Sequence, residues 1–173
     1  MQKSGKIATE PRPIRIEDLL QPERVACRGG VGSKKRAIEL ISELMVAGRQ
    51  DLTQTQVFGC LIERERLGST GLGHGAAIPH GRLKGLNQAI CSFLKLNEGV
   101  EFDASDEQSV DLVCGLLVPE DSTNEHLNIL ALLAEMFSDA EFCDRVRHAR
   151  TGREIYDLLV SWRRSDRGKT ASV

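Results

Sequence analysis

Residues 64–82 read RERLGSTGLGHGAAIPHGR, and this segment separates a helical pattern before it from a strand pattern after it. Its five glycines, at positions 68, 71, 73, 75 and 81, predict an irregular backbone whose N–H groups can approach a ligand closely. Ala76 to His80 is a short apolar piece that Pro79 keeps extended, because the residue before a proline avoids the helical region. The pattern therefore predicts that a short strand ends at His80.

The same segment contains G-x-G-x-x-A, which is one form of the dinucleotide-binding fingerprint. That fingerprint requires a strand before it and a helix after it, whereas here a helical pattern precedes it and a strand follows. No G-K-[ST] sequence follows the glycines either. Both nucleotide-binding interpretations are therefore excluded.

Helical spacing dominates the chain before this segment. Ser33 can cap a helix that runs to about Val46, and Thr53 with Gln56 forms a capping-box pattern for a second helix that ends at Gly68. After the segment, two apolar runs at 88–96 and 110–118 predict strands that are buried on both faces.

Helices return in the last third of the chain. Ser122 with Glu125 forms another capping-box pattern, Asp139 can open a shorter helix, and Thr151 opens a last helix that ends at Trp162. This order predicts an α/β fold, a single domain with a mixed central β-sheet flanked by α-helices on both faces. The domain is expected over 13–162, between flexible tails at 1–12 and 163–173.

The composition is that of a globular protein, with 40% hydrophobic and 28% charged residues in a chain of 173. The net charge of -2 gives no general attraction for nucleic acid, and the short basic stretches carry no interleaved aromatic residues. No apolar segment is long enough for a secretory signal or for membrane insertion, which favours a cytoplasmic location. The five separate cysteines suggest packing roles and no disulfide framework.

Two histidines are the main candidates for chemistry. Imidazole can act as a base, a metal ligand or a nucleophile, and alone His80 would usually be a packed or surface histidine. His126 falls in the first turn of the helix predicted after Ser122, where free N–H groups and the helix dipole favour an anion. The two rings, an arginine and this helix terminus would form a phosphate site if the fold brings them together.

The sequence resembles the IIA proteins of the bacterial phosphotransferase system, in particular the mannitol/fructose class and its nitrogen-regulatory branch. The resemblance covers residues 14–162, and its most specific element is IPHG preceded by GSTG. The matching segments are SKKRAIELISEL (33–44), RERLGSTGLGHGAAIPHGRL (64–83), FDASDEQSVDLVCGLLVP (102–119) and EHLNILALLAE (125–135).

The resemblance implies that His80 is the phosphorylated residue, that His126 is the second active-site histidine and that Arg64 is the active-site arginine. It also implies phosphate contacts from Ser69 and Thr70. The donor would be a phosphohistidine on an HPr-like phosphocarrier, so neither a metal nor another cofactor is expected. In the expected mechanism, neutral His80 attacks, Arg64 neutralises the phosphoryl oxygens and His126 donates a hydrogen bond.

The resemblance further implies a regulatory role for a single IIA domain without fused IIB or IIC segments. Expected regulatory targets are a potassium transport component or a sensor kinase. Three alternatives remain open: the IIA component of a fructose- or mannitol-type importer, a binding module that has lost phosphotransfer, and a metal site formed by His74, His80 and His126. The regulatory branch commonly has Asn at the position of His74, which leaves a spare imidazole near the predicted site.

Overall fold

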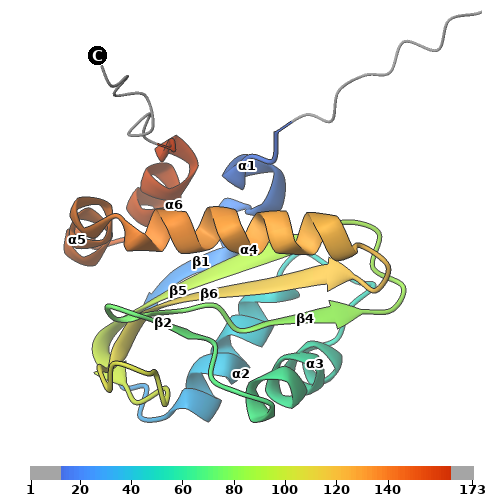
Figure 1. The fold of residues 1–173 in the computed structure, drawn as a ribbon, viewed down its shortest axis with the longest axis horizontal. Helices are drawn as coiled ribbons and strands as arrows, with labels where there is room; N and C mark the ends of the chain where they lie inside the picture. The colour runs from blue at the N-terminus through green and yellow to red at the C-terminus, as the bar shows by residue number, and fades with distance from the viewer. Residues whose placement is uncertain (1–12, 165–173) are drawn as a thin grey trace, which may run out of the picture.

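The structure is a computed structural model that describes residues 13–164. The predicted tail at 1–12 lies outside the described residues, as does the predicted tail at 163–173 apart from Arg163 and Arg164. A mixed six-stranded sheet forms the centre of the molecule (Figure 1). The strands are β1 (Val25–Arg28), β2 (Gly71–Gly73), β3 (Ala76–Ala77), β4 (His80–Leu83), β5 (Ile90–Val100) and β6 (Val110–Pro119). The helices are α1 (Ile16–Leu19), the 3-10 turn η1 (Pro22–Arg24), α2 (Lys34–Met45), α3 (Gln54–Arg66), α4 (Thr123–Ser138), α5 (Ala140–His148) and α6 (Gly152–Ser161).

The strand order is β1-β5-β6-β3-β2. Strands β3 and β4 follow one another along the same edge of β6, so both pair with it. The central pair, β5 and β6, is antiparallel, whereas β1 runs parallel to β5, and β3 and β4 both run parallel to β6. The predicted α/β fold with a mixed sheet is confirmed. Strand β4 pairs only with β6, so its other side is a free edge of the sheet.

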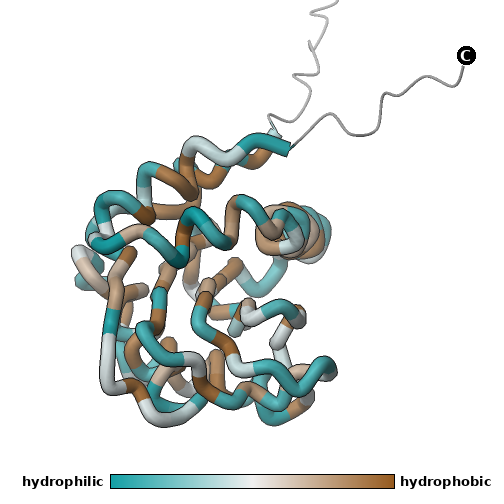
Figure 2. Tube along the Cα trace, turned by 90° about the vertical axis from the view of Figure 1, so that its left-hand side faces the viewer, coloured by the Kyte–Doolittle hydropathy of each residue, from teal (hydrophilic) through white to brown (hydrophobic). Residues whose placement is uncertain are grey.

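Helices cover both faces of the sheet, as predicted. In Figure 1, α2 and α3 lie below the strands, and α4 lies above them with α1, α5 and α6. Two separate cores result, one on each face, because adjacent strand residues point to opposite sides. In Figure 2 the Cα tube changes repeatedly between hydrophobic and hydrophilic colours along the helices, as expected for helices with one buried face.

Side-chain caps begin four of the helices, where the sequence predicted them. Ser33 accepts a hydrogen bond from the backbone N–H of Arg36, and Thr53, Asp139 and Thr151 make the equivalent bond at α3, α5 and α6. The predicted capping box of Ser122 with Glu125 is wrong, because the Ser122 side chain makes no cap bond. Its backbone has ψ of 66°, far from the extended conformation in which a serine hydroxyl can reach the N–H groups of the first turn.

The segment that leads to His80 also differs from the prediction. The predicted strand over 76–80 is two strands, since β3 ends at Ala77 and His80 begins β4. Pro79 has no N–H to donate, and it interrupts the ladder without changing the register against β6, which pairs Ala77 with Val113 and His80 with Leu116. The extended backbone therefore continues past His80 to Leu83.

None of the helices in the described part of the chain is long and apolar enough to cross a bilayer.

Candidate functional site

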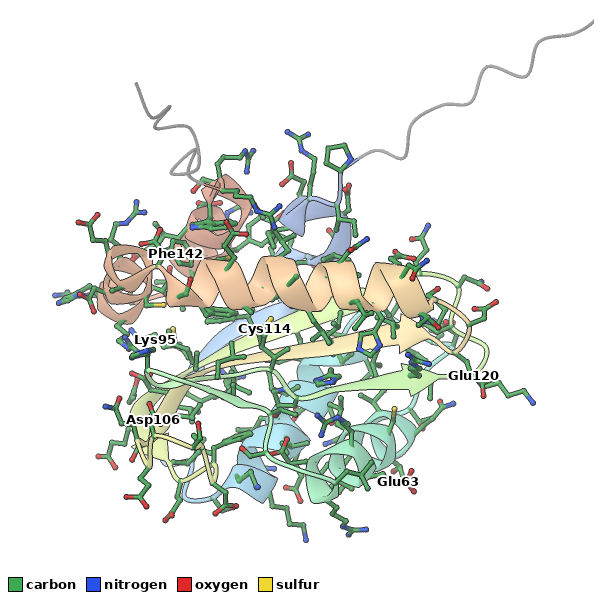
Figure 3. All side chains as sticks on the ribbon, viewed as in Figure 1. Glu63, Lys95, Asp106, Cys114, Glu120 and Phe142 are labelled. Carbon is green, nitrogen blue, oxygen red and sulfur yellow. The ribbon has the colours of Figure 1, made fainter. Side chains whose placement is uncertain are left out.

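The free edge of β4 lies between α3 on one side and α4 on the other, and a cavity of about 320 Å³ opens there. Glu63 and Glu120, labelled at the right of Figure 3, mark this end of the molecule. The lining residues come from α3, β4 and the start of α4, and they are Cys60, Glu63, Arg64, Leu67, His80, Gly81, Arg82 and His126. The fold thus brings together the three residues predicted for phosphotransfer, namely Arg64, His80 and His126.

Successive β4 residues face opposite sides of the sheet, one side toward α3 and the other toward α4. A Cβ placed on Gly81 would meet Cys60 Sγ at 2.5 Å, so this position faces α3 and has no room for a side chain. The neighbours His80 and Arg82 point the other way, toward His126 at the start of α4. Glycine between them therefore lets β4 lie close against α3.

The His80 ring is oriented by its own backbone. Its Nδ1 lies 2.8 Å from the carbonyl oxygen of Ile78. A carbonyl oxygen can only accept, so Nδ1 carries the proton and the neutral ring has its lone pair on Nε2. Burial lowers the pKa of His80 from the ordinary value of 6.5, although the Ile78 carbonyl acts in the opposite direction. The ring is therefore held in the neutral form that a nucleophile requires.

His126 packs against His80 from the other side of the cavity. The ring centroids are 5.3 Å apart, with the planes at 67°, and His126 is only 8% exposed. Its pKa is also lowered from 6.5, first by burial and then by His80 and the cations Arg82 and Arg64. Two neutral, hydrogen-bonding rings thus share one site with two guanidinium groups.

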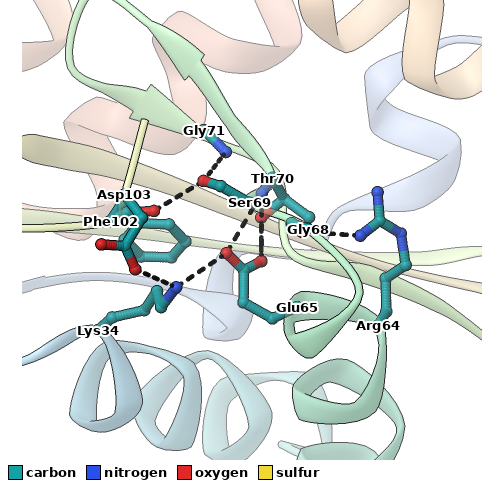
Figure 4. A network of polar contacts seen from close by, with 9 residues as sticks. All are labelled: Lys34, Arg64, Glu65, Gly68, Ser69, Thr70, Gly71, Phe102 and Asp103. Atoms are coloured by element: carbon teal, nitrogen blue, oxygen red, sulfur yellow. Dashed lines mark hydrogen bonds and ion pairs between the residues drawn. The ribbon is translucent and has the colours of Figure 1, made fainter. Parts of the chain in front are cut away.

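Arg64 projects from the last turn of α3, where a cation also interacts favourably with the helix C-terminus. One of its terminal nitrogens donates a hydrogen bond to the carbonyl of Gly68 at 2.9 Å, which places the guanidinium beside the cavity (Figure 4). The other donors of the guanidinium are not used by this bond.

Ser69 and Thr70 are not among the residues that line the cavity. The Ser69 hydroxyl donates to the carbonyl of Phe102 at 2.7 Å, and the buried Thr70 hydroxyl donates to Glu65 at 2.5 Å (Figure 4). Both hydroxyls hold the glycine-rich loop against its neighbours. Their predicted contacts with phosphate stay a prediction.

His74 is not near the site, contrary to expectation. It lies in the β2–β3 turn, where its N–H donates to Asp106, and Asp106 is at the opposite end of the molecule from Glu120 (Figure 3). Ala76 pairs with Leu112 of β6, and His80 pairs with Leu116, four residues further along the same strand. Four strand residues span about 13 Å, so the turn that holds His74 is well separated from His80. Within residues 13–164 no group of three or more His, Cys, Asp or Glu side chains could hold a metal ion.

Arg82 and Cys60 are among the lining residues that the sequence did not predict for the site. Arg82 lies two positions after His80, and the period of two in a strand could have placed it on the same face if β4 had been predicted to continue. Cys60 was assigned to packing, and it lines the cavity while its thiol donates to the carbonyl of Arg82.

Comparison with known proteins identifies the family of this chain. Residues 18–162 match the model of the family described as "Phosphoenolpyruvate-dependent sugar phosphotransferase system, EIIA 2". The chain belongs to the EIIA 2 family. The family is a phosphotransfer component of that system, and the resemblance noted in the sequence is confirmed.

Nitrogen regulatory proteins are similar to this chain along most of its length. One from Pseudomonas aeruginosa is 43% identical over 147 residues, which cover 85% of this chain and 96% of that protein. The crystal structure of the nitrogen regulatory protein IIA-Ntr from Neisseria meningitidis has a TM-score of 0.76 at 41% identity, covering 83% of this chain and 98% of the other. A fructose-specific EIIA component from Haloferax volcanii is 31% identical over 146 residues, 84% of this chain and 94% of that one.

Proposed function

We propose that this chain is a nitrogen-regulatory IIA protein, which accepts a phosphoryl group on His80 from an HPr-like phosphocarrier and regulates partner proteins according to its phosphorylation state. The observation that carries the proposal is the bond from His80 Nδ1 to the Ile78 carbonyl. It leaves the lone pair on Nε2, at a cavity that also holds Arg64, Arg82 and His126.

The transfer would form a bond between His80 Nε2 and phosphorus as the bond between phosphorus and the carrier's histidine breaks. The electron pair of the broken bond stays on the carrier's nitrogen. The proton on His80 Nδ1 remains bonded to the Ile78 carbonyl, which stabilises the positive charge that the ring gains. Arg64 would neutralise the phosphoryl oxygens, and His126 would donate a hydrogen bond to them.

The rim of the cavity supports a protein as the phosphoryl donor. Leu67 lines the cavity and is 86% exposed, and Leu127, the neighbour of His126, is 60% exposed. Large exposed apolar side chains beside a polar site are a feature of protein docking surfaces. A carrier could bury both leucines while it presents its phosphohistidine to His80.

The direct test is incubation with phosphoenolpyruvate, an enzyme I-type kinase and an HPr-like carrier, followed by mass spectrometry. We expect the addition of one phosphoryl group to the native protein and none to His80→Ala, because Nε2 is the only atom proposed to form the new bond. His126→Ala and Arg64→Ala should slow the transfer and leave the fold intact. Phosphorylation of His80→Ala at an unchanged rate would contradict the assignment of the site.

The stability of the phosphoryl bond gives a second readout. A phosphohistidine is a phosphoramidate, so the modified protein should lose phosphate in acid and keep it in alkali. The opposite behaviour would point to a hydroxyl such as that of Ser69 or Thr70.

The 31% identity to a fructose-specific EIIA component favours one alternative, in which the chain is the IIA subunit of a sugar importer. This alternative uses the same residues and differs in the acceptor. Rapid transfer from phosphorylated His80 to a IIB domain would support the importer. Phosphorylation-dependent binding of a regulatory target, such as a potassium transport component or a sensor kinase, would support the regulatory role.

A further inference from the structure

Among residues 13–164, Arg82 is the one guanidinium with a hydrogen bond to a histidine of the site. Its side chain is exposed and lies on the face of β4 that also carries His80. Its Nε lies 3.4 Å from Nδ1 of His126, across the gap between β4 and α4. Within residues 13–164 Arg82 makes no ion pair with a carboxylate and no other side-chain hydrogen bond, so this contact is not part of a larger network.

The contact determines which nitrogen of His126 carries the proton. A guanidinium has only donors, so Nδ1 of His126 must accept and cannot be protonated. In the neutral ring the proton is then on Nε2. That atom is buried and has no hydrogen-bond partner among the described residues. A buried N–H group without a partner is costly, and it is a donor for whatever acceptor enters the cavity.

We propose that Arg82 is a positioning residue, which fixes His126 with its proton on Nε2 so that this nitrogen donates to the phosphoryl group carried by His80. The proposal rests on the phosphotransfer function of His80 proposed above. The two rings lie edge to face with centroids 5.3 Å apart, so a phosphoryl group on His80 would lie beside His126. Without the Arg82 contact the His126 proton could move to Nδ1, and Nε2 would then repel a phosphoryl oxygen.

Two substitutions separate the donated hydrogen bond from the charge. Glutamine places its amide nitrogen as many bonds from the backbone as arginine places Nε, so Arg82→Gln keeps a donor and removes the charge. Arg82→Met has a similar length and removes both. Both changes are at an exposed side chain, and both should leave the fold intact.

The first measurement is the ¹⁵N chemical shifts of the His126 ring in the unphosphorylated protein at a pH where the ring is neutral. We expect Nε2 to be the protonated nitrogen in the native protein and in Arg82→Gln. In Arg82→Met we expect a mixture of the two tautomers. A protonated Nδ1 in the native protein, or an unchanged tautomer in Arg82→Met, would overturn the proposal.

The second measurement is the rate of phosphoryl transfer to His80. Loss of one hydrogen bond in the transition state should slow Arg82→Met by about tenfold, and Arg82→Gln should be slowed less. Equal slowing of the two variants would mean that Arg82 acts by its charge alone, which would also overturn the proposal. Because the tautomer is measured without a carrier, failure of the native protein to be phosphorylated would count against the proposed function and not against the tautomer assignment.

Discussion

At the scale of single residues, the chemistry of this site depends on which ring nitrogens carry protons. The Ile78 carbonyl fixes the proton of His80 on Nδ1, and Arg82 fixes that of His126 on Nε2. One ring is thereby left with a lone pair and the other with a free N–H. Two chemically identical side chains acquire complementary roles from their different hydrogen-bond partners.

The pKa shifts of the two histidines predict how the site responds to pH. Burial, the largest cause, lowers the pKa of both rings from 6.5, so both should become protonated at a lower pH than a free imidazole does. An NMR titration of the ring protons should give midpoints below that value for the interacting pair. A midpoint above 6.5 for His80 would contradict this expectation and would remove the basis for a neutral nucleophile at that pH.

The same shifts affect stability. Between 6.5 and the lower folded-state pKa, the unfolded chain binds more protons than the folded chain, so the free energy of unfolding falls as the pH is lowered through this window. His80→Gln cannot bind that proton in either state. Its unfolding free energy should therefore depend less on pH than that of the native protein, as measured by urea denaturation at several pH values. An equal dependence would mean that His80 does not contribute.

How far the site could be predicted differs from residue to residue. His80, His126 and Arg64 were predicted because the family resemblance implied them, and the structure places all three at one cavity. Arg82 was missed because the strand was expected to end at His80. Only a strand that continues to Leu83 places Arg82 on the same face as His80. The partners of the Ser69 and Thr70 hydroxyls come from Phe102 and Glu65, and contacts across such turns have no signature in a single sequence.

At the scale of elements, the position of β4 depends on its contact with α3 at Gly81. In Gly81→Ala the new methyl group would overlap with Cys60 Sγ and approach the Cys60 carbonyl oxygen at 3.3 Å. We expect a loss of about 1–3 kcal/mol in the free energy of unfolding and slower phosphoryl transfer, because β4 carries His80 away from Arg64 as it moves. Adding Cys60→Ala removes the sulfur, so it should restore part of the free energy of unfolding and part of the transfer rate. A double-mutant cycle would measure this coupling. Strictly additive effects would contradict a direct contact.

The loop after α3 is held by a carboxylate. Glu65 is 5% exposed and accepts bonds from the backbone and hydroxyl of Thr70, and it also pairs with Lys34 Nζ at 3.4 Å (Figure 4). Glu65→Ala leaves the backbone N–H and the hydroxyl of Thr70 without this acceptor, whereas Lys34 keeps its ion pair with Asp103 at 3.0 Å. Glu65→Ala should lower the free energy of unfolding, measured by urea denaturation, by about 2–3 kcal/mol. This loss is smaller than the loss expected on breaking a fully buried ion pair, because Lys34 is partly exposed.

The matched control for this change is Glu63→Ala, two residues earlier on α3. Glu63 is exposed and makes no hydrogen bond or ion pair in the described part of the chain, so its removal should change the free energy of unfolding by no more than about 0.5 kcal/mol. Equal effects of the two substitutions would show that Glu65 stabilises the helix alone and not the loop.

Helices with a strong local signal were the elements that sequence analysis predicted best. Their caps at Ser33, Thr53, Asp139 and Thr151 are short-range bonds within one turn. Strand β1 and the short β2 were not predicted, because four and three residues give no periodicity. Strand β1 forms by pairing with the distant β5, and β2 forms by a short turn back onto β3. At Ser122 the backbone N–H instead donates to the carbonyl of Pro119 in the turn after β6, and no side-chain cap forms.

At the scale of the whole molecule, the sheet joins two cores that share no side chains. Along β5, Phe93 belongs to the core beneath α4 and the next residue, Leu94, to the core above α2 and α3. On β6, Cys114 and Val113 alternate in the same way. Every central strand therefore loses half of its buried contacts if either helical layer detaches, which predicts that the two layers unfold together.

This cooperativity can be tested because the chain has a single tryptophan, Trp162, which belongs to the core under α4. Leu61→Ala creates a cavity in the other core, where Leu61 is fully buried, and should lower the free energy of unfolding by about 2–5 kcal/mol. Trp162 fluorescence and far-ultraviolet circular dichroism should report the same shifted midpoint in urea. The control is Leu159→Ala in the core of Trp162 itself, which should shift both signals to a similar degree. If Leu61→Ala moved the circular dichroism transition and left the Trp162 transition in place, the layers would unfold separately, and the α3 side of the candidate site could open while the α4 side stayed folded.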